Sequence, residues 1–203
     1  MSRYPIPQTT TRIEYMMSNS RFISTVGYAA SIDEAKAFIQ SIRDEMPDAS
    51  HHVYAFRVGY GSSVIEGMSD DGEPSGTSGP PALAVLRGSN IGDIVLVITR
   101  FFGGTKLGTG GLVYAYTNAA KEAITALPTE LKVARKLVGV TVPYHLYERL
   151  KQLTDKYEGL LEEEDFGAEI TRYIRFPEEN ITPFSEDIRE LSAGQVTPVL
   201  LDE

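Results

Sequence analysis

The chain has 203 residues, of which 42% are hydrophobic and 23% are charged. This composition is typical of a soluble globular protein and excludes disordered, collagen-like and membrane-spanning chains. The sequence contains no cysteine, which excludes disulfides, thiolate metal sites and cysteine nucleophiles. The formal net charge of −9 lowers the expectation of nucleic-acid binding, although a local basic patch can exist on an acidic chain.

Two features of the sequence indicate where the protein acts. A chain without cysteine suits a reducing compartment. Residues 1–12 are polar and contain two prolines, so they lack the apolar core of an export signal, and no run approaches the ~18 apolar residues of a membrane helix. We therefore expect a cytoplasmic protein that has no membrane contact.

The first part of the chain predicts an α+β domain. Residues 12–30 contain two short strands rich in β-branched and aromatic side chains. Ser31 and Glu34 form a capping box, and apolar residues at helical spacing continue that helix until Pro47. The remaining expected elements are strands at 51–59 and 63–68, a loop at 69–79, a short helix at 82–87, a central strand at 94–98, a glycine-rich turn at 103–111 and a helix at 112–127.

The last part of the chain predicts a second α+β domain with the order βαββαβ. Its expected strands are 137–142, 160–164, 169–176 and 195–200, and its expected helices are 144–157 and 186–192. This order is the ferredoxin-like signature. We therefore place the two domains at residues 1–130 and 131–203.

The strongest local feature is the glycine-rich turn that follows the most apolar strand. A strand that leads through such a turn into a helix directs free backbone N–H groups at whatever lies above it, and anions bind there readily. Arg100 and Lys106 would add positive charge at the same place. The spacing is neither a Walker motif nor Gly-x-Gly-x-x-Gly. The alternative is that the glycines only allow a tight turn and close packing of the helix on the sheet.

The acidic residues of the loop at 69–79 offer a second candidate site. Asp70, Asp71 and Glu73 could supply a general base or oxygen ligands for a cation, but acidic turns are ordinarily solvated and the spacing matches no calcium loop. His51 and His52 are adjacent on a strand, so they face opposite sides of the sheet. The sequence predicts no metal and no cofactor.

Four segments of the sequence resemble the IMPACT/YigZ family. They are Ser20-Arg21-Phe22, Ser50-His51, the string SDDGEPSGTSG at residues 69–79, and the string TRFFGGTKLGTGGL at residues 99–112. The match covers about residues 20–127, and the following βαββαβ segment is similar to the extra domain of bacterial members.

The resemblance implies both a fold and a setting. The implied first domain is like ribosomal protein S5 domain two and domain four of elongation factor G, and the second is like domain five of that factor. Such folds normally meet RNA or ribosomes, and eukaryotic members act as translation regulators that bind a ribosome-associated activator of a kinase. The implied partners are RNA, the ribosome or a translation-associated protein, although likeness of fold is analogy and identifies no site.

The sequence departs from the family pattern where positive charge is usual. Pro80 replaces a lysine after the small-residue loop, Tyr114 replaces an arginine, and His52 follows His51 where asparagine is usual. Each of the first two changes removes a cation from the face that the resemblance implies for binding, which lowers the expected affinity for RNA.

Three hypotheses follow from the sequence. The first, which we favour, is a non-enzymatic module that docks on RNA, the ribosome or a translation-associated protein. The second is an enzyme that binds a phosphorylated or carboxylated metabolite at the glycine-rich turn and uses an acidic residue of the loop at 69–79 as a base or metal ligand. The third is a structural role in which Arg100 points inward and pairs with Asp70 or Asp71. The residues assigned to the binding face are Arg100, Phe101, Gly103, Gly104, Lys106, Gly108, Gly110, Gly111, Asp70, Asp71, Glu73 and His51.

Overall fold

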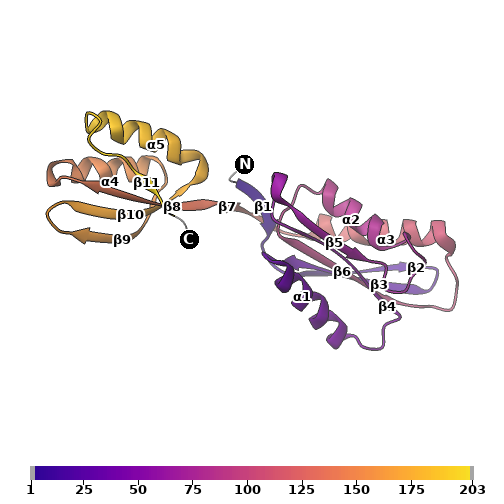
Figure 1. Ribbon diagram of the computed structural model, residues 1–203. Coiled ribbons are helices and arrows are strands. Elements are labelled where there is room, and N and C mark those ends of the chain that lie inside the picture. The colour runs from indigo at the N-terminus through magenta and orange to yellow at the C-terminus, as the bar shows by residue number, and fades with distance from the viewer. Residues whose placement is uncertain (1–2, 202–203) are drawn as a thin grey trace. The chain divides into compact units, whose positions relative to one another are not determined.

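The computed structural model describes residues 3–201, and its elements are labelled in Figure 1. The chain divides into two compact units: an N-terminal unit of residues 4–131, and a C-terminal unit that contains Arg3 and the residues from 132 onward. Both units mix helices and strands, which confirms the predicted α+β class. Within the described residues, no helix is both long and apolar enough to cross a membrane.

A five-stranded antiparallel sheet forms the centre of the N-terminal unit. Its strands are β2 (Thr11–Met17), β3 (Ser20–Tyr28), β4 (His51–Val58), β5 (Ile65–Ser69) and β6 (Ile94–Phe101), in the order β2-β3-β6-β4-β5. A short 3₁₀ turn at Gly61–Ser63 joins β4 to β5. All of β6 except Phe101 is buried, as its two-sided apolar pattern predicts for a central strand.

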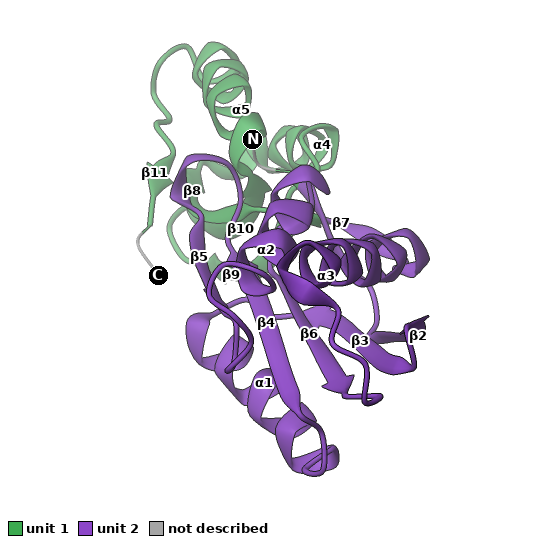
Figure 2. Cartoon of the chain, turned by 90° about the vertical axis from the view of Figure 1, so that its right-hand side faces the viewer, with its two compact units in different colours: residues 1–3, 132–203 green, residues 4–131 purple. Residues whose placement is uncertain are grey.

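Helices cover both faces of this sheet. Figure 2 shows α1 (Ile32–Glu45) on one side and α2 (Gly79–Gly88) and α3 (Gly108–Ala126) on the other. The side chain of Ser31 accepts a hydrogen bond from the Glu34 amide, and the Glu34 carboxylate accepts one from the amide of Ala30, so α1 begins where the capping pattern predicts. The larger apolar core lies under α2 and α3 and contains Phe22 and Tyr116 in edge-to-face contact.

The C-terminal unit has the βαββαβ order that the sequence predicts. Its elements are β8 (Arg135–Val142), a 3₁₀ turn at Tyr144–Leu146, α4 (Tyr147–Lys156), β9 (Leu160–Phe166), β10 (Ile170–Pro177), α5 (Glu178–Leu191) and β11 (Val199–Leu200). The sheet order β11-β8-β10-β9 places the first and last strands side by side. Alternate residues of β8 and β10 point into one core with α4 and α5, and this core includes Leu150, Phe176 and Phe184.

Two strands were not predicted. β1 (Arg3–Pro7) pairs with β7 (Thr129–Val133) in a two-stranded sheet. The prolines of β1 argue against a strand from sequence, yet proline is tolerated at the edge of a small sheet because one side of each strand needs no partner.

Several element boundaries also differ from the prediction. α3 begins at Gly108 instead of residue 112, so Gly110 and Gly111 belong to its first turn. α5 begins at Glu178 instead of residue 186 and contains Pro183. Two acidic residues in the first turn of α5 favour its start, and the burial of Phe184 and Ile188 stabilises the helix despite the proline. β11 has only two of the expected six residues.

Candidate functional site

A buried ion pair lies at the carboxyl end of β6, on the face of the sheet that α2 and α3 cover. Arg100, whose exposed fraction is 4%, donates from Nη1 to Glu73 Oε1 over 2.7 Å. The Tyr116 hydroxyl donates to the same oxygen over 2.7 Å, and Arg100 Nη2 reaches Ser20 Oγ over 3.2 Å. Burial, followed by the nearby Glu73 carboxylate, raises the pKa of the Tyr116 phenol. The phenol therefore keeps its proton and stays a donor.

His51 and Asp71 extend this network to the start of β4. His51 Nδ1 lies 2.8 Å from the Asp71 carbonyl oxygen, and because a carbonyl only accepts, Nδ1 carries the proton. His51 Nε2 lies 3.8 Å from Glu73 Oε2. The Asp71 carboxylate accepts hydrogen bonds from the His52 amide and from Arg43 of α1. The loop is therefore tied to the sheet by its own acidic residues.

Asp70 binds the backbone at the start of α2. Its Oδ1 accepts hydrogen bonds from the amides of Ser78 and Gly79 over 3.0 and 2.8 Å, and its Oδ2 accepts one from Gly76 over 2.8 Å. Ser78, the N-cap residue, makes no side-chain hydrogen bond to the helix. Asp70 therefore supplies the cap that satisfies the first amides of α2 and closes the loop.

We expect Asp70 to make the stability of the N-terminal unit depend on pH. Burial alone would raise the pKa of Asp70, but the hydrogen bonds from Gly76, Gly79 and Ser78 outweigh it, and the pKa lies below its ordinary value. A lowered pKa stabilises the fold above the unfolded value of about 3.9, and this contribution is lost as the pH falls through the folded value.

The variant Asp70→Asn should lack this pH-dependent part of the unfolding free energy and should be less stable at pH 7 by about 1–2 kcal/mol. Urea unfolding at pH 3, 5 and 7 would measure both effects. Equal dependence on pH in the variant and the unmodified chain would contradict the assigned cap.

The glycine-rich turn is only partly the open amide site that the sequence predicts. The Gly103 amide donates to Ser20 Oγ over 3.3 Å, and the Phe102 amide donates to Ser50 Oγ over 3.2 Å. Arg100 lies beneath the turn in its ion pair with Glu73 and not above it in solvent. The expectation of two cations that flank outward amides is therefore wrong for Arg100, and its partner is Glu73 instead of Asp70 or Asp71.

The outer part of the same segment is exposed. Gly104, Thr105 and Lys106 lie in solvent, and α3 starts without a side-chain cap because Leu107 occupies the N-cap position. Large apolar side chains accompany them: Phe102 is 49% exposed and Tyr114 is 60% exposed. We call the exposed residues of this segment, namely Phe102, Gly104, Thr105, Lys106, Gly108, Thr109, Gly110, Val113 and Tyr114, the docking face.

A groove between α2 and α3 adjoins the docking face at Val113. Its volume is about 620 Å³, and Pro81, Val85 and Ile124 contribute to its apolar walls. Lys121 is the one charged residue among those that line it. Neither Pro80, which is half-buried, nor Tyr114, which is 60% exposed, adds a charge beside this groove.

The structure brings together some of the predicted site residues and separates others. His51, Asp71, Glu73 and Arg100 form one network, in which Glu73 and Arg100 are buried and His51 and Asp71 are half-buried, and Asp70 lies in the same loop. Phe101 faces the other side of the sheet, where the Arg21 guanidinium lies 4.6 Å from its ring centre. Gly103 and Gly111 are half-buried, and the Gly103 amide donates to Ser20, whereas Gly104, Gly108 and Gly110 are exposed.

Sequence reasoning missed three residues of the site: Tyr116 and Ser20, which belong to the buried network, and Ser50, which is exposed and accepts a hydrogen bond from the Phe102 amide. Tyr116 occupies the apolar stripe of α3 and is fully buried, so its spacing predicts a core residue and says nothing of its hydroxyl. Ser20 and Ser50 are small polar residues beside strands, and no local pattern distinguishes them from turn residues. Their hydrogen bonds depend on strands that are distant in sequence.

The three acidic residues of the loop are therefore occupied within the protein. Asp70 accepts backbone amides, Asp71 accepts an amide and Arg43, and Glu73 accepts Arg100 and Tyr116. Across residues 3–201, no three His, Asp or Glu side chains lie close enough together to hold a metal ion. This arrangement favours a structural role for the loop and leaves the docking face as the surface available to a partner.

Comparisons with known proteins agree along the whole chain. Residues 18–124 match the model of the Impact N-terminal domain, and residues 140–195 match a domain of unknown function, DUF1949. The chain is 36% identical to an IMPACT family member of Haemophilus influenzae over 100% of this chain and 98% of that protein. It is 33% identical to IMPACT family member YigZ of Escherichia coli strain K12 over 100% of both. A crystal structure of a hypothetical protein, 34% identical, gives a TM-score of 0.72 over 100% of this chain and 99% of that one.

Proposed function

Because the chain belongs to the IMPACT family, we propose that it is a non-enzymatic docking module that acts in translation or its regulation by binding a translation-associated protein. The translational setting is the one that the family resemblance implies. The observation that carries the docking role is the exposed apolar segment at residues 102–114, which is fixed from beneath by the network of Arg100, Glu73 and Tyr116.

The composition of the docking face supports a protein partner over RNA. Phe102, Val113 and Tyr114 are exposed by 49%, 39% and 60%, and aromatic side chains of this kind are enriched at the centres of protein interfaces. Lys106 is the only charged residue of the docking face, and Arg100 cannot reach a phosphate because Glu73 and the loop cover it. A single surface cation gives little of the phosphate neutralisation on which RNA binding depends.

Co-sedimentation with bacterial ribosomes tests the proposal. We expect the chain to bind ribosomes prepared at low salt, which retain associated proteins, and to lose binding when a high-salt wash strips those proteins. Adding the wash fraction back should restore binding. The double variant Lys106→Ala/Tyr114→Ala should bind at least about tenfold more weakly, because exposed aromatic anchors carry much of the energy of an interface.

A matched variant on the other unit controls for general changes in surface charge and apolar area. Tyr144 is 56% exposed and the side chain of Lys151 on α4 is 45% exposed, so Tyr144→Ala/Lys151→Ala makes the same two changes and should bind normally. A different result would show contact with RNA: the chain binds stripped ribosomes, and Lys106→Ala alone makes that binding less dependent on salt. No binding to either preparation, or equal binding by the two double variants, would overturn the proposal.

A further inference from the structure

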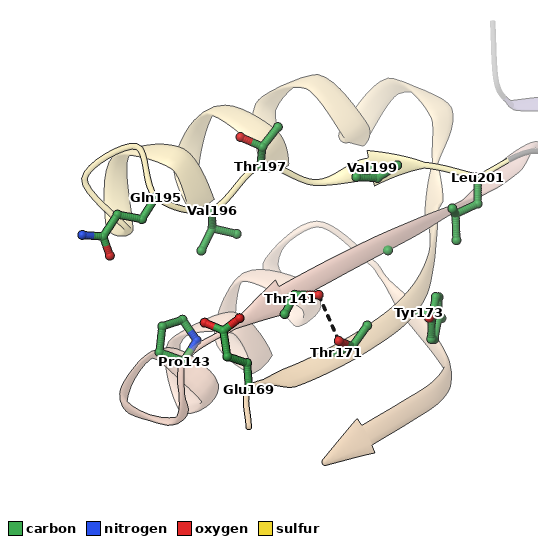
Figure 3. Close-up of a pocket in the computed structure, with 11 residues that line it drawn as sticks. Thr141, Pro143, Glu169, Thr171, Tyr173, Gln195, Val196, Thr197, Val199 and Leu201 are labelled. Atoms are coloured by element: carbon green, nitrogen blue, oxygen red, sulfur yellow. Dashed lines mark hydrogen bonds between the residues drawn. The ribbon is translucent and has the colours of Figure 1, made fainter. Parts of the chain in front are cut away.

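A cavity lies on the face of the C-terminal sheet opposite α4 and α5. Its volume is about 590 Å³. Figure 3 shows Thr141 of β8 and Thr171 and Tyr173 of β10 beneath it, with the chain from Gln195 to Leu201 along one side. The hydroxyls of the two threonines lie 2.9 Å apart and are hydrogen bonded to each other.

Gly139 of β8 provides apolar space in this cavity. A Cβ atom built at Gly139 would lie 3.5 Å from Leu201 Cδ1 and 3.6 Å from Tyr173 Cε1, which are ordinary contact distances. The absence of a side chain at Gly139 therefore leaves a gap between an aliphatic and an aromatic side chain. A gap of this size accepts a small apolar group.

Acidic side chains lie beside the same cavity. Glu169 lines it, and the pairing of β9 with β10 places Asp165 opposite Thr171 and Glu163 opposite Tyr173. Residues directly opposite in an antiparallel pair share a face, so Asp165 and Glu163 stand on the face that carries the cavity. All three acidic residues are exposed.

The basic residues of β10 each have an acidic partner. Arg172 is buried on the helix side, where it pairs with Glu164, whereas Arg175 stands on the same face as Thr171 and Tyr173 and pairs with Glu162. Among the described residues, no basic side chain forms an ion pair with Glu163, Asp165 or Glu169. The face around the cavity is therefore negative and apolar together.

We propose that this face docks an extended basic segment of a partner protein. Glu163 and Asp165 are two residues apart on β9, so their side chains repeat every 6.5–7 Å or so, which is also the repeat of alternate side chains in an extended peptide. Basic side chains at that spacing meet the two carboxylates, while a small apolar side chain enters the gap above Gly139. A phosphate backbone is repelled by the same carboxylates, which excludes RNA from this face.

This surface belongs to the C-terminal unit and is independent of the docking face at residues 102–114. Either one can fail without the other. The chain would then have two surfaces for partners, the largely apolar docking face and the acidic face of the C-terminal sheet.

Binding of a synthetic peptide of alternating lysine and valine to the full chain tests the proposal by fluorescence anisotropy in low salt. The variant Glu163→Gln/Asp165→Asn should weaken binding at least about tenfold. Glu148→Gln/Glu186→Gln removes the same charge from exposed helical positions and should change binding less than about twofold. Circular dichroism would show that each variant is folded.

A second variant separates the cavity from general charge attraction. Gly139→Leu fills the gap between Leu201 and Tyr173. It should weaken binding of the lysine–valine peptide at least about fivefold and leave binding of a lysine–serine peptide unchanged. Three results would overturn the proposal: no binding of the lysine–valine peptide, equal weakening by the two charge variants, or equal binding of that peptide by Gly139→Leu and the unmodified chain. The proposal would also be overturned if the chain binds a poly-uridine oligonucleotide and Glu163→Gln/Asp165→Asn strengthens that binding. The face would then be assigned to nucleic acid.

Discussion

Replacing Glu73 by Gln is expected to destabilise the N-terminal unit by about 3–5 kcal/mol, because the change leaves a buried guanidinium without its counter-charge. Glu73 and Arg100 are 4% and 5% exposed at their side chains, so water cannot replace the lost carboxylate. Arg100 Nε already lacks a hydrogen-bond partner among the described residues. Because the substitution keeps the size of the side chain, the loss of stability measures the removal of the charge and not the creation of a cavity.

The measurement is urea unfolding of the full chain, followed by hydrogen exchange of the peptide that covers β6, which reports the N-terminal unit alone. Glu45→Gln removes one partner of an exposed pair with Arg12 and should leave the unfolding midpoint nearly unchanged. The double variant Glu73→Leu/Arg100→Met should recover most of the lost stability, since a buried pair can be replaced by apolar residues of similar volume. A Glu73→Gln variant as stable as the unmodified chain would contradict the assigned ion pair.

Replacing Gly103 by Ala should also destabilise the N-terminal unit strongly, by about 3 kcal/mol. A Cβ atom at this position would lie 1.9 Å from the carbonyl oxygen and 2.1 Å from the carbonyl carbon of Asn19. Both are backbone atoms of the turn between β2 and β3, where Asn19 already has a φ of 63°. Neither the turn nor the end of β6 can move away without breaking strand pairing.

Gly110→Ala is the matched control for this prediction. No atom lies within 4 Å of a Cβ built at Gly110, which stands in the first turn of α3, so alanine there should leave stability unchanged or raise it by up to about 1 kcal/mol. Thermal unfolding of the two variants measures the difference. Similar melting temperatures would show that close packing is not the reason for glycine at position 103.

Sequence reasoning succeeded where the signal is local and failed where partners are distant. The buried run of β6, the capping box of α1 and the alternating pattern of β10 predict their elements from a few neighbouring residues. β1 and α5 contain prolines that locally oppose a strand or a helix, and packing elsewhere in the fold overrides them. Periodicity therefore predicted the architecture but missed β1 and the part of α5 before residue 186, which depend on tertiary contacts.

The same distinction explains the candidate site. Glycines and cations close together in sequence predict an anion site, but the direction of Arg100 depends on which face of β6 carries it and on which acidic residue the loop brings there. Glu73 was a candidate base, and the structure places it beneath the turn against Arg100 and Tyr116. The sequence contained the members of this network without indicating their pairing.

The central claim is that the partner contacts the docking face and does not contact the buried ion pair of Arg100 and Glu73 beneath it. Sedimentation of Glu73→Leu/Arg100→Met with ribosomes prepared at low salt tests this claim most directly, because the double variant removes every charge of the central ion pair while the docking face stays intact. We predict that the folded double variant binds as tightly as the unmodified chain. A folded double variant that no longer binds would show that Arg100 or Glu73 contacts the partner, and it would contradict the claim.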